Sequence, residues 1–179
     1  FLELGAGFGS KILSLSQRGD FSTLPLIACE YAQSGRDLIS LLAKTSKKSI
    51  AIGNCDFWKL KLEDIVIPAD AVIFPSYAVH YIPELAVDFV QFLARCRPRV
   101  VVHFEPCYEH YATDTLHGMM CRRYVEVNDY TRNLVTAVAE GCRRAGIPLR
   151  MRKNVLGSNP FLPISVIEWT PGQRPNTRT

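Results

Sequence analysis

The sequence predicts an α/β protein: a doubly wound, mostly parallel seven-stranded sheet with helices on both faces and a C-terminal antiparallel hairpin. Three observations support this fold class. Short apolar runs rich in β-branched residues alternate with segments whose apolar residues recur at helical spacing. The alternation occurs five times along the chain, as in a series of β–α units. The last two apolar runs follow each other directly, as the strands of a hairpin do.

The expected elements can be placed in order along the chain. A strand at 1–4 leads through a glycine loop into a helix that starts near Ser10, a good N-cap residue. A strand at 25–31, continuous enough to be buried on both faces, precedes a helix over 33–44. The remaining elements are strands at 49–56, 69–76 and 99–106, a helix from Pro83 to before Pro98, a helix capped by Asn128 or Asp129 and stopped by Gly146, and hairpin strands at 148–156 and 163–169.

One domain over 1–171 accounts for these elements, followed by a flexible tail over 172–179. The 179 residues contain no internal repeat and no apolar run long enough to span a membrane, so we expect no membrane partner. The sequence opens inside a strand with no signal peptide, which indicates a cytoplasmic protein with a truncated N-terminus. The long, aromatic-rich connection over 107–127 predicts a lid or substrate insert, with a short helix packed on the sheet as the alternative.

The composition argues against several classes of site. The six cysteines are spread through strand and helix patterns, which indicates reduced, buried thiols and no disulfide framework. Cys107, His110, His117 and Cys121 match no standard zinc spacing, so we expect no metal site. The net charge of +4 is mild, and the basic clusters lack the aromatic motif of an RNA-binding module. Nucleic acid is therefore the less favoured partner.

The loop after the first strand carries the strongest functional signal. Residues 3–9 read Glu-Leu-Gly-Ala-Gly-Phe-Gly, with three glycines at alternate positions. Glycines let the backbone turn sharply and approach a ligand closely. The dinucleotide fingerprint G-x-G-x-x-G would need a glycine at position 10, where Ser10 stands. A smaller, cationic ligand is therefore favoured over a pyrophosphate, and the carboxylate of Glu3 suits an ammonium or sulfonium group.

This E-x-G-x-G-x-G string resembles the first motif of class I methyltransferases, which use S-adenosyl-L-methionine. The family's acidic residue after the second strand, which binds the ribose hydroxyls, matches Glu30. The acidic residue after the third strand, which reads the adenine amino group, matches Asp56, with Phe57 as a stacking side chain. The terminal hairpin also matches, and the resemblance covers nearly the whole chain. The cofactor-binding residues that it implies are Glu3, Gly5, Ala6, Gly7, Gly9, Glu30, Tyr31, Asp56, Phe57, Phe74, Pro75 and Ser76.

The family's fourth motif falls on residues 74–81, Phe-Pro-Ser-Tyr-Ala-Val-His-Tyr. Phe74 replaces the polar residue with which amino-group methyltransferases hold the target amine, so the stretch is closer to small-molecule methyltransferases. Methyl transfer depends mainly on the alignment of donor and acceptor, and a general base helps with hydroxyl or amine acceptors. The catalytic candidates are His80 as that base, Glu105 as a second base or substrate ligand, and Tyr77 as a residue that shapes the pocket.

We therefore predict an S-adenosyl-L-methionine-dependent methyltransferase that acts on a small-molecule or metabolite acceptor. A non-catalytic cofactor-binding module of a larger protein or complex is one alternative. A nucleic-acid methyltransferase that uses the basic clusters is another, and a nicotinamide oxidoreductase is a third, since Glu30 suits an NAD ribose equally well. His80, Glu105 and Tyr77 also have structural interpretations, as a hydrogen-bonding, an ion-pairing and a packing residue.

Overall fold

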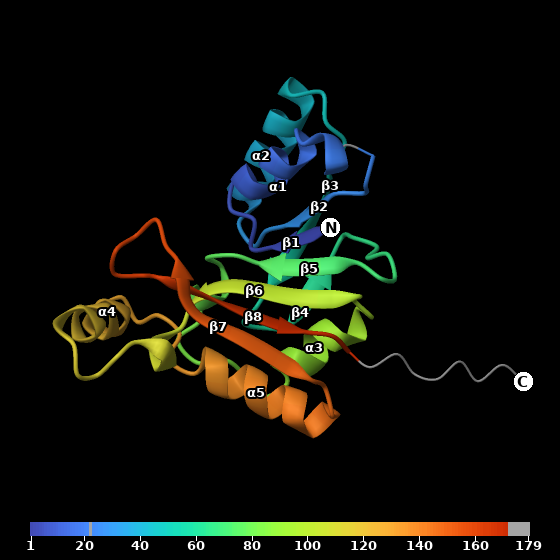
Figure 1. The fold of residues 1–179 in the computed structure, drawn as a ribbon. Coiled ribbons are helices and arrows are strands. Elements are labelled where there is room, and N and C mark those ends of the chain that lie inside the picture. The colour runs from blue at the N-terminus through green and yellow to red at the C-terminus, as the bar shows by residue number, and fades with distance from the viewer. Residues whose placement is uncertain (22, 172–179) are drawn as a thin grey trace, which may run out of the picture.

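The computed structural model describes residues 1–21 and 23–171, and the strands of this part form one eight-stranded sheet (Figure 1). The tail expected over 172–179 lies outside the described residues. The strands are β1 (Leu2–Leu4), β2 (Ile27–Cys29), β3 (Ala51–Asp56), β4 (Lys61–Glu63), β5 (Val72–Pro75), β6 (Val100–Pro106), β7 (Leu149–Leu156) and β8 (Ile164–Trp169). The helices are α1 (Ser10–Ser16), α2 (Gln33–Thr45), α3 (Phe89–Arg95), α4 (Leu116–Val127) and α5 (Leu134–Ala145), with the short 3-10 helices η1 (Gly19–Phe21), η2 (Val79–Tyr81) and η3 (Tyr108–His110).

The strand order is β4-β3-β2-β1-β5-β6-β8-β7. Five neighbouring strands, β3, β2, β1, β5 and β6, pair in parallel. Strand β8 runs antiparallel to β6, and β7 runs antiparallel to β8. The predicted parallel sheet and the C-terminal hairpin are therefore confirmed. The eighth strand, β4, adds an antiparallel edge beside β3. Its three residues are too few to show a periodic pattern in the sequence.

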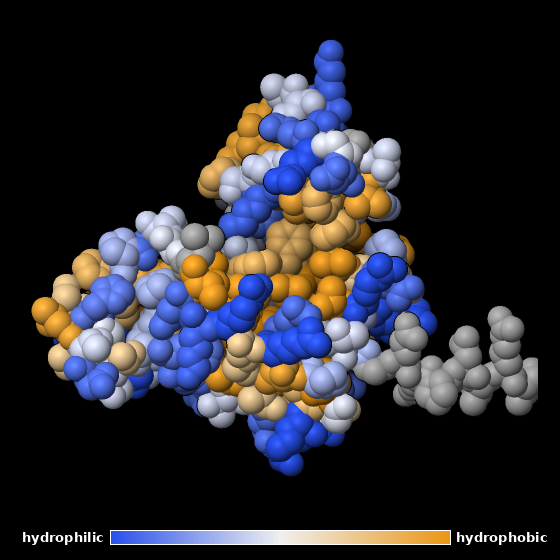
Figure 2. Space-filling model, in the orientation of Figure 1, coloured by the Kyte–Doolittle hydropathy of each residue, from blue (hydrophilic) through white to orange (hydrophobic). Residues whose placement is uncertain are grey.

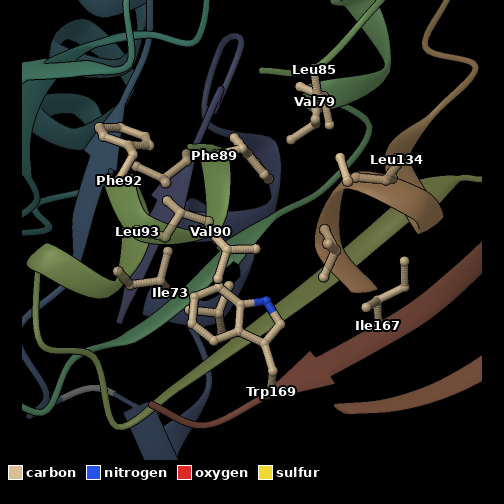
Figure 3. Packing of buried hydrophobic residues seen from close by; sticks show 14 of the residues in the cluster. Ile73, Val79, Leu85, Phe89, Val90, Phe92, Leu93, Leu134, Ile167 and Trp169 are labelled. Atoms are coloured by element: carbon tan, nitrogen blue, oxygen red, sulfur yellow. The ribbon is translucent and has the colours of Figure 1, made fainter. Parts of the chain in front are cut away.

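Helices cover both faces of the sheet, as expected of a doubly wound fold. Alternate residues of a strand point to opposite faces, and here they divide between two cores. One core joins Ile73 and Ile167 to Phe89 of α3 and Leu134 of α5, and Figure 3 shows them within one group of buried side chains. The second core joins the strands to α1 and α2 on the other face, through the buried residues Ala28, Phe74, Ile12 and Ile39. In the described ranges, no helix combines the length and the hydropathy that a membrane span requires.

The helix expected from Pro83 begins six residues later, at Phe89. The intervening segment is bonded to another part of the chain. The backbone amide and carbonyl of Leu85 are both paired with the side-chain amide of Asn133, at 2.9 and 3.1 Å. These bonds occupy the backbone groups of Leu85 that a helix would pair internally, so the helix begins only after this segment. The helix ends at Arg95, before Pro98, as predicted.

Two predicted helix caps were wrong in detail. Asn128 and Asp129 follow the end of α4, and α5 begins at Leu134 with Asn133 in the N-cap position. The intervening chain at 129–132 instead binds the loop after β5, through hydrogen bonds from Thr131. At α1, Gly9 occupies the N-cap position and Ser10 is the first helical residue. The predicted stop of α5 at Gly146 is confirmed by its left-handed cap, with φ of 64°.

The connection over 107–127 contains η3 and the twelve-residue helix α4. This helix lies to one side of the sheet, beside the loop that joins β7 and β8 (Figure 1). Cys121 and Val125 of α4 are buried against Leu162 of that loop, and the ring of Tyr124 stacks on Phe161. The segment is therefore folded and packed, and its function as a lid or substrate insert stays a prediction.

Candidate functional site

A cavity of about 380 Å³ lies where the central parallel strands reach their carboxyl ends. This is the edge at which open α/β sheets bind ligands, and the volume falls in the range of small-molecule sites. The walls come mainly from the loops that follow β1, β2, β3 and β5, with contributions from the start of α1 and the end of β3. They consist of Gly5, Ala6, Gly7, Phe8, Ser10, Lys11, Glu30, Tyr31, Cys55, Phe57, Trp58, Ser76, Tyr77, Ala78, Tyr81 and Ile82.

The glycine loop supplies the wall beside β1. Gly5 and Gly7 have left-handed backbones, with φ of 68° and 59°, which glycine adopts without strain. A Cβ on Gly5 would lie 2.4 Å from the Cβ of Ala78, whereas a Cβ on Gly7 would meet no atom within 4 Å. Packing therefore requires a glycine at position 5, and the backbone at Gly7 lines the open cavity. Gly9 does not line the cavity, because it caps α1 against Ile39.

Glu30 ties the loop after β2 to the glycine loop. Its Oε2 accepts a hydrogen bond from the amide of Gly7 at 2.8 Å, and its Oε1 accepts one from Ala32 at 2.9 Å. The guanidinium of Arg36 donates to the carbonyl oxygens of Glu30 and Tyr31, which holds the strand end in place. Glu30 is half-buried and Tyr31 is exposed, and both line the cavity, while their predicted contact with a cofactor stays a prediction.

Asp56 binds the backbone of the turn that follows β3 and does not line the cavity. Its Oδ1 accepts hydrogen bonds from the amides of Trp58 and Lys59, at 2.9 and 3.0 Å, and Lys59 Nζ lies 3.5 Å from Oδ2. These bonds fix the turn that presents Phe57 and Trp58 to the cavity. Trp58 is 65% exposed, although a large apolar side chain gains free energy on burial. An exposed aromatic ring at the edge of a cavity indicates a surface that a ligand can cover.

Glu3 is fully buried and does not line the cavity either. Its Oε2 accepts a hydrogen bond from the amide of Ile12 at 3.0 Å, so the carboxylate binds the first turn of α1. Lys11 Nζ lies 3.8 Å from the other oxygen. Burial raises the pKa of Glu3 to about 7, against the opposing effects of Lys11 and of the Ile12 amide.

The fourth predicted motif divides between the sheet and the cavity. Phe74 and Pro75 are buried in β5, whereas Ser76 and Tyr77 line the cavity. Tyr77 has a left-handed backbone, with φ of 51°. Its amide donates to the carbonyl of Phe104 at 3.1 Å and its hydroxyl donates to the carbonyl of Leu162 at 3.2 Å. The strand β6 and the loop between β7 and β8 thus hold the strained residue at the cavity wall.

Glu105 and His80 lie behind that wall. The fully buried carboxylate of Glu105 accepts hydrogen bonds from the amides of Ala78 and Val79, at 2.8 and 3.0 Å. Its second oxygen lies 3.3 Å from Nδ1 of His80, a side chain that is also buried. Neither side chain lines the cavity. The arrangement fixes the loop over 77–82, four residues of which form part of the wall.

Several wall residues were not predicted from the sequence: Phe8, Ser10, Lys11, Cys55, Trp58, Ala78 and Ile82. Each is close in sequence to a predicted residue, so extending each motif by one or two positions would have included them.

The four residues considered as a possible metal site in the sequence do not come together as one: Cys107, His110, His117 and Cys121. In the part of the chain that the structure describes, no three His, Cys, Asp or Glu side chains are placed to hold a metal ion.

Solved structures with the same architecture are found among methyltransferases. The structure of PigF with SAH has a TM-score of 0.64 and 18% identity, over 95% of this chain and 50% of that chain. The small RNA methyltransferase HEN1 has a TM-score of 0.65 and 13% identity, over 97% of this chain and 23% of HEN1. The LepI complex with SAM has a TM-score of 0.59 and 12% identity, over 96% of this chain and 42% of LepI. The chain has the class I methyltransferase fold.

The chain spans half or less of each of these three structures. No protein-family model matches it, and no curated protein does. Within this methyltransferase fold, the structure brings the glycine loop, Glu30, Phe57 and Tyr77 to one cavity. It leaves Glu3 and Asp56 outside the cavity, bonded to the backbone of neighbouring turns.

Proposed function

We propose that the protein is an S-adenosyl-L-methionine-dependent methyltransferase that acts on a small-molecule acceptor. The observation that carries this proposal is the cavity at the glycine loop, which joins the half-buried carboxylate of Glu30 to exposed aromatic rings on a methyltransferase fold. The names of two similar structures, PigF with SAH and LepI with SAM, record that this fold holds the cofactor or its demethylated product in those proteins.

The residues present fit the cofactor. The open space at Gly7 allows close approach of a ligand to the loop backbone. Glu30 is a carboxylate acceptor at the end of β2, suited to the two hydroxyls of a ribose. Phe57 and Trp58 offer faces on which an adenine ring stacks. When bound, S-adenosyl-L-methionine supplies a methyl group that its sulfonium activates for displacement.

The contribution of this chain to the reaction is mainly alignment, because an in-line displacement depends on the relative position of donor and acceptor. Tyr77, Ala78 and Tyr81 form the wall after β5. Glu105 and His80 hold that wall through the amides of 78 and 79, so we assign them a positioning role. Of the three side chains predicted to be catalytic, only Tyr77 lines the cavity, and we assign it the contact with the reacting groups.

Binding is tested by thermal unfolding of the purified chain with increasing S-adenosyl-L-methionine. A ligand at one hundred times its Kd stabilises the folded state by about 2.7 kcal/mol, which raises the Tm by about 5 °C or more. Glu30→Ala should raise the Kd at least about tenfold, equivalent to about 1.4 kcal/mol. Glu84→Ala is the matched control, because Glu84 is exposed and lies outside this cavity. No rise in Tm at millimolar cofactor would overturn the proposal.

Transfer is tested separately, with methyl-labelled cofactor and a panel of acceptors that includes phenols, carboxylic acids, amines and short RNA. Label transferred to a small acceptor supports the proposed substrate class. Label transferred only to RNA contradicts it, and binding without transfer to any member of the panel contradicts catalysis. The RNA arm is run at low and high salt, because phosphate contacts weaken steeply as the salt concentration rises.

A further inference from the structure

Lys11 is the second residue of α1 and lines the cavity where the glycine loop passes into that helix. The residues that follow it, Ile12 and Leu13, are buried in the core, whereas Lys11 lies on the outer side of the helix. Figure 2 shows hydrophilic residues over α1, next to hydrophobic residues in the middle of the same face. Lys11 therefore brings a cation to the wall of the cavity.

The cavity wall contains few charged side chains. Among the described residues that line it, Glu30 is the one carboxylate and Lys11 is the one cation. The strand order β3-β2-β1-β5 places Glu30, after β2, on one side of the glycine loop and Tyr77, after β5, on the other. Lys11 belongs to the segment that follows β1, between these two in the order of the strands. The two opposite charges thus come from neighbouring strand ends.

Glu3 neutralises Lys11 only in part. Nζ of Lys11 lies 3.8 Å from Oε1 of Glu3, a distance too long for a hydrogen bond. This oxygen is buried and has no hydrogen-bond partner among the described residues. Burial raises the pKa of Glu3 to about 7, so near neutral pH a large share of the molecules have an uncharged Glu3. The ammonium of Lys11 carries three N–H groups, and with Glu3 uncharged its charge is available to a ligand.

The methyl donor of the proposed function has a group that matches this cation. Its adenosyl end carries the ribose hydroxyls for which Glu30 is suited, and its amino-acid end carries a carboxylate. A carboxylate that enters a cavity loses hydration, which costs free energy unless an opposite charge or hydrogen-bond donors replace the water. Lys11 can supply both, because an ammonium and a carboxylate form a charge-assisted hydrogen bond.

We propose that Lys11 binds the carboxylate at the amino-acid end of S-adenosyl-L-methionine. The proposal rests on the proposed function, and it adds a residue that holds the donor at its second end. In the covalent structure of the donor, the sulfonium lies between the ribose and the amino-acid end. Glu30 and Lys11 then restrain the donor on both sides of the sulfonium, which limits the directions in which its methyl group can point. Such alignment is what an in-line displacement requires.

The test compares two donors that differ in this carboxylate alone, S-adenosyl-L-methionine and its decarboxylated form. In calorimetric titrations of the purified chain, the decarboxylated form should have a Kd at least about fivefold higher, because it lacks a charge-assisted hydrogen bond. In Lys11→Gln, the Kd of S-adenosyl-L-methionine should rise at least about fivefold, while that of the decarboxylated form should not rise. The two Kd values should therefore converge. Unimpaired binding of the decarboxylated form also shows that the variant is folded.

Two further variants control for the position and the charge of the lysine. Lys11→Arg keeps the cation, so it should keep most of the preference for the carboxylate. Lys44→Gln is the matched control, because Lys44 is an exposed lysine in the last turn of α2 and does not line the cavity. This control variant should bind both donors as the unchanged chain does.

Two results would overturn this proposal and leave the proposed function standing. One is equal affinity of the unchanged chain for the two donors. The other is a preference for the carboxylate that Lys11→Gln retains in full, because other groups would then bind it. Binding of neither donor to the unchanged chain would overturn the proposed function, and this proposal with it. A preference that disappears in Lys11→Gln and persists in Lys11→Arg and Lys44→Gln supports the proposal.

Discussion

The Nδ1 atom of His80 lies 3.3 Å from Oε2 of Glu105, and both side chains are buried. The other oxygen of the same carboxylate accepts from two backbone amides of the loop after β5. From the opposite direction, Thr131 donates its amide hydrogen to the carbonyl of His80 and its hydroxyl hydrogen to that of Val79. The loop that forms one wall of the cavity is thus anchored by the end of β6 and by the segment before α5.

Glu105→Ala should destabilise the fold strongly, because it leaves two amides and an imidazole buried without their acceptor. Unsatisfied buried donors cost about 1–3 kcal/mol each, so we expect a loss of about 3 kcal/mol in the free energy of unfolding, measured by urea denaturation. Glu109→Ala is the comparison. Glu109 accepts from the amides of Val135 and Thr136 at the start of α5, a partly exposed cap worth about 1 kcal/mol.

The conservative variant Glu105→Gln separates anchoring from chemistry. The glutamine carbonyl can still accept from Ala78 and Val79, so we expect it to recover most of the stability lost in Glu105→Ala. If Glu105 only positions the loop, transfer activity should return with stability and the pH profile of kcat should be unchanged. A stable Glu105→Gln protein without activity would show that the carboxylate takes part in the reaction.

Gly5→Ala and Gly7→Ala form a matched pair in the glycine loop. Both positions have left-handed backbones, so alanine costs about 1 kcal/mol or more at either one. Only at Gly5 would the new Cβ collide with another atom, the Cβ of Ala78 at 2.4 Å. Gly5→Ala should therefore lower the Tm clearly more than Gly7→Ala. Equal losses would mean that the loop moves away from Ala78 at little cost.

Glu3 should make the protein less stable as the pH rises. Its folded-state pKa of about 7 lies above the ordinary value of 4.5, so the folded state binds the proton more tightly than the unfolded state. Stability is then lost between about pH 4.5 and 7, with a total of about 3 kcal/mol. Glu3→Gln should flatten this part of the profile of unfolding free energy against pH. A profile that the substitution leaves unchanged would contradict the assignment.

His103 should have the opposite effect. Burial in the core lowers its pKa to about 4, against the opposing charge of Glu105. The folded state therefore keeps the imidazole neutral, and its Nε2 accepts a hydrogen bond from Trp169 Nε1 at 3.0 Å. Stability from this group is present above pH 6.5 and is lost as the pH falls toward 4, by about 3 kcal/mol in total. His103→Gln should remove this acid-side loss in urea titrations made across that range.

Most of the fold could be predicted because its elements leave periodic patterns. Continuous apolar strands such as β6 and amphipathic helices such as α5 were placed within a few residues. The errors fall where long-range hydrogen bonds override local pattern. Asn133 binds Leu85, 48 positions away, and no local signal at Pro83 records that pairing. The short strand β4 is likewise defined by its hydrogen bonds to β3, and not by a local sequence pattern.

The candidate site was predictable in place and only partly in detail. Glycines and carboxylates at the ends of successive strands indicated one edge of the sheet, and the cavity lies there. The direction of each carboxylate depends on which backbone amides lie within reach. Glu30 reaches Gly7 at the cavity, whereas Asp56 turns to the amides that follow it and Glu3 turns to α1. The spacing of these residues in the sequence does not indicate which backbone amide each carboxylate binds.

The two tryptophans of the chain occupy opposite environments. Trp58 is largely exposed at the cavity, while Trp169 is buried and bonded to His103. Their fluorescence should therefore separate into a red-shifted and a blue-shifted emission. The first reports occupancy of the cavity and the second reports integrity of the core, so one emission spectrum of the unlabelled protein can follow ligand binding and unfolding as independent signals.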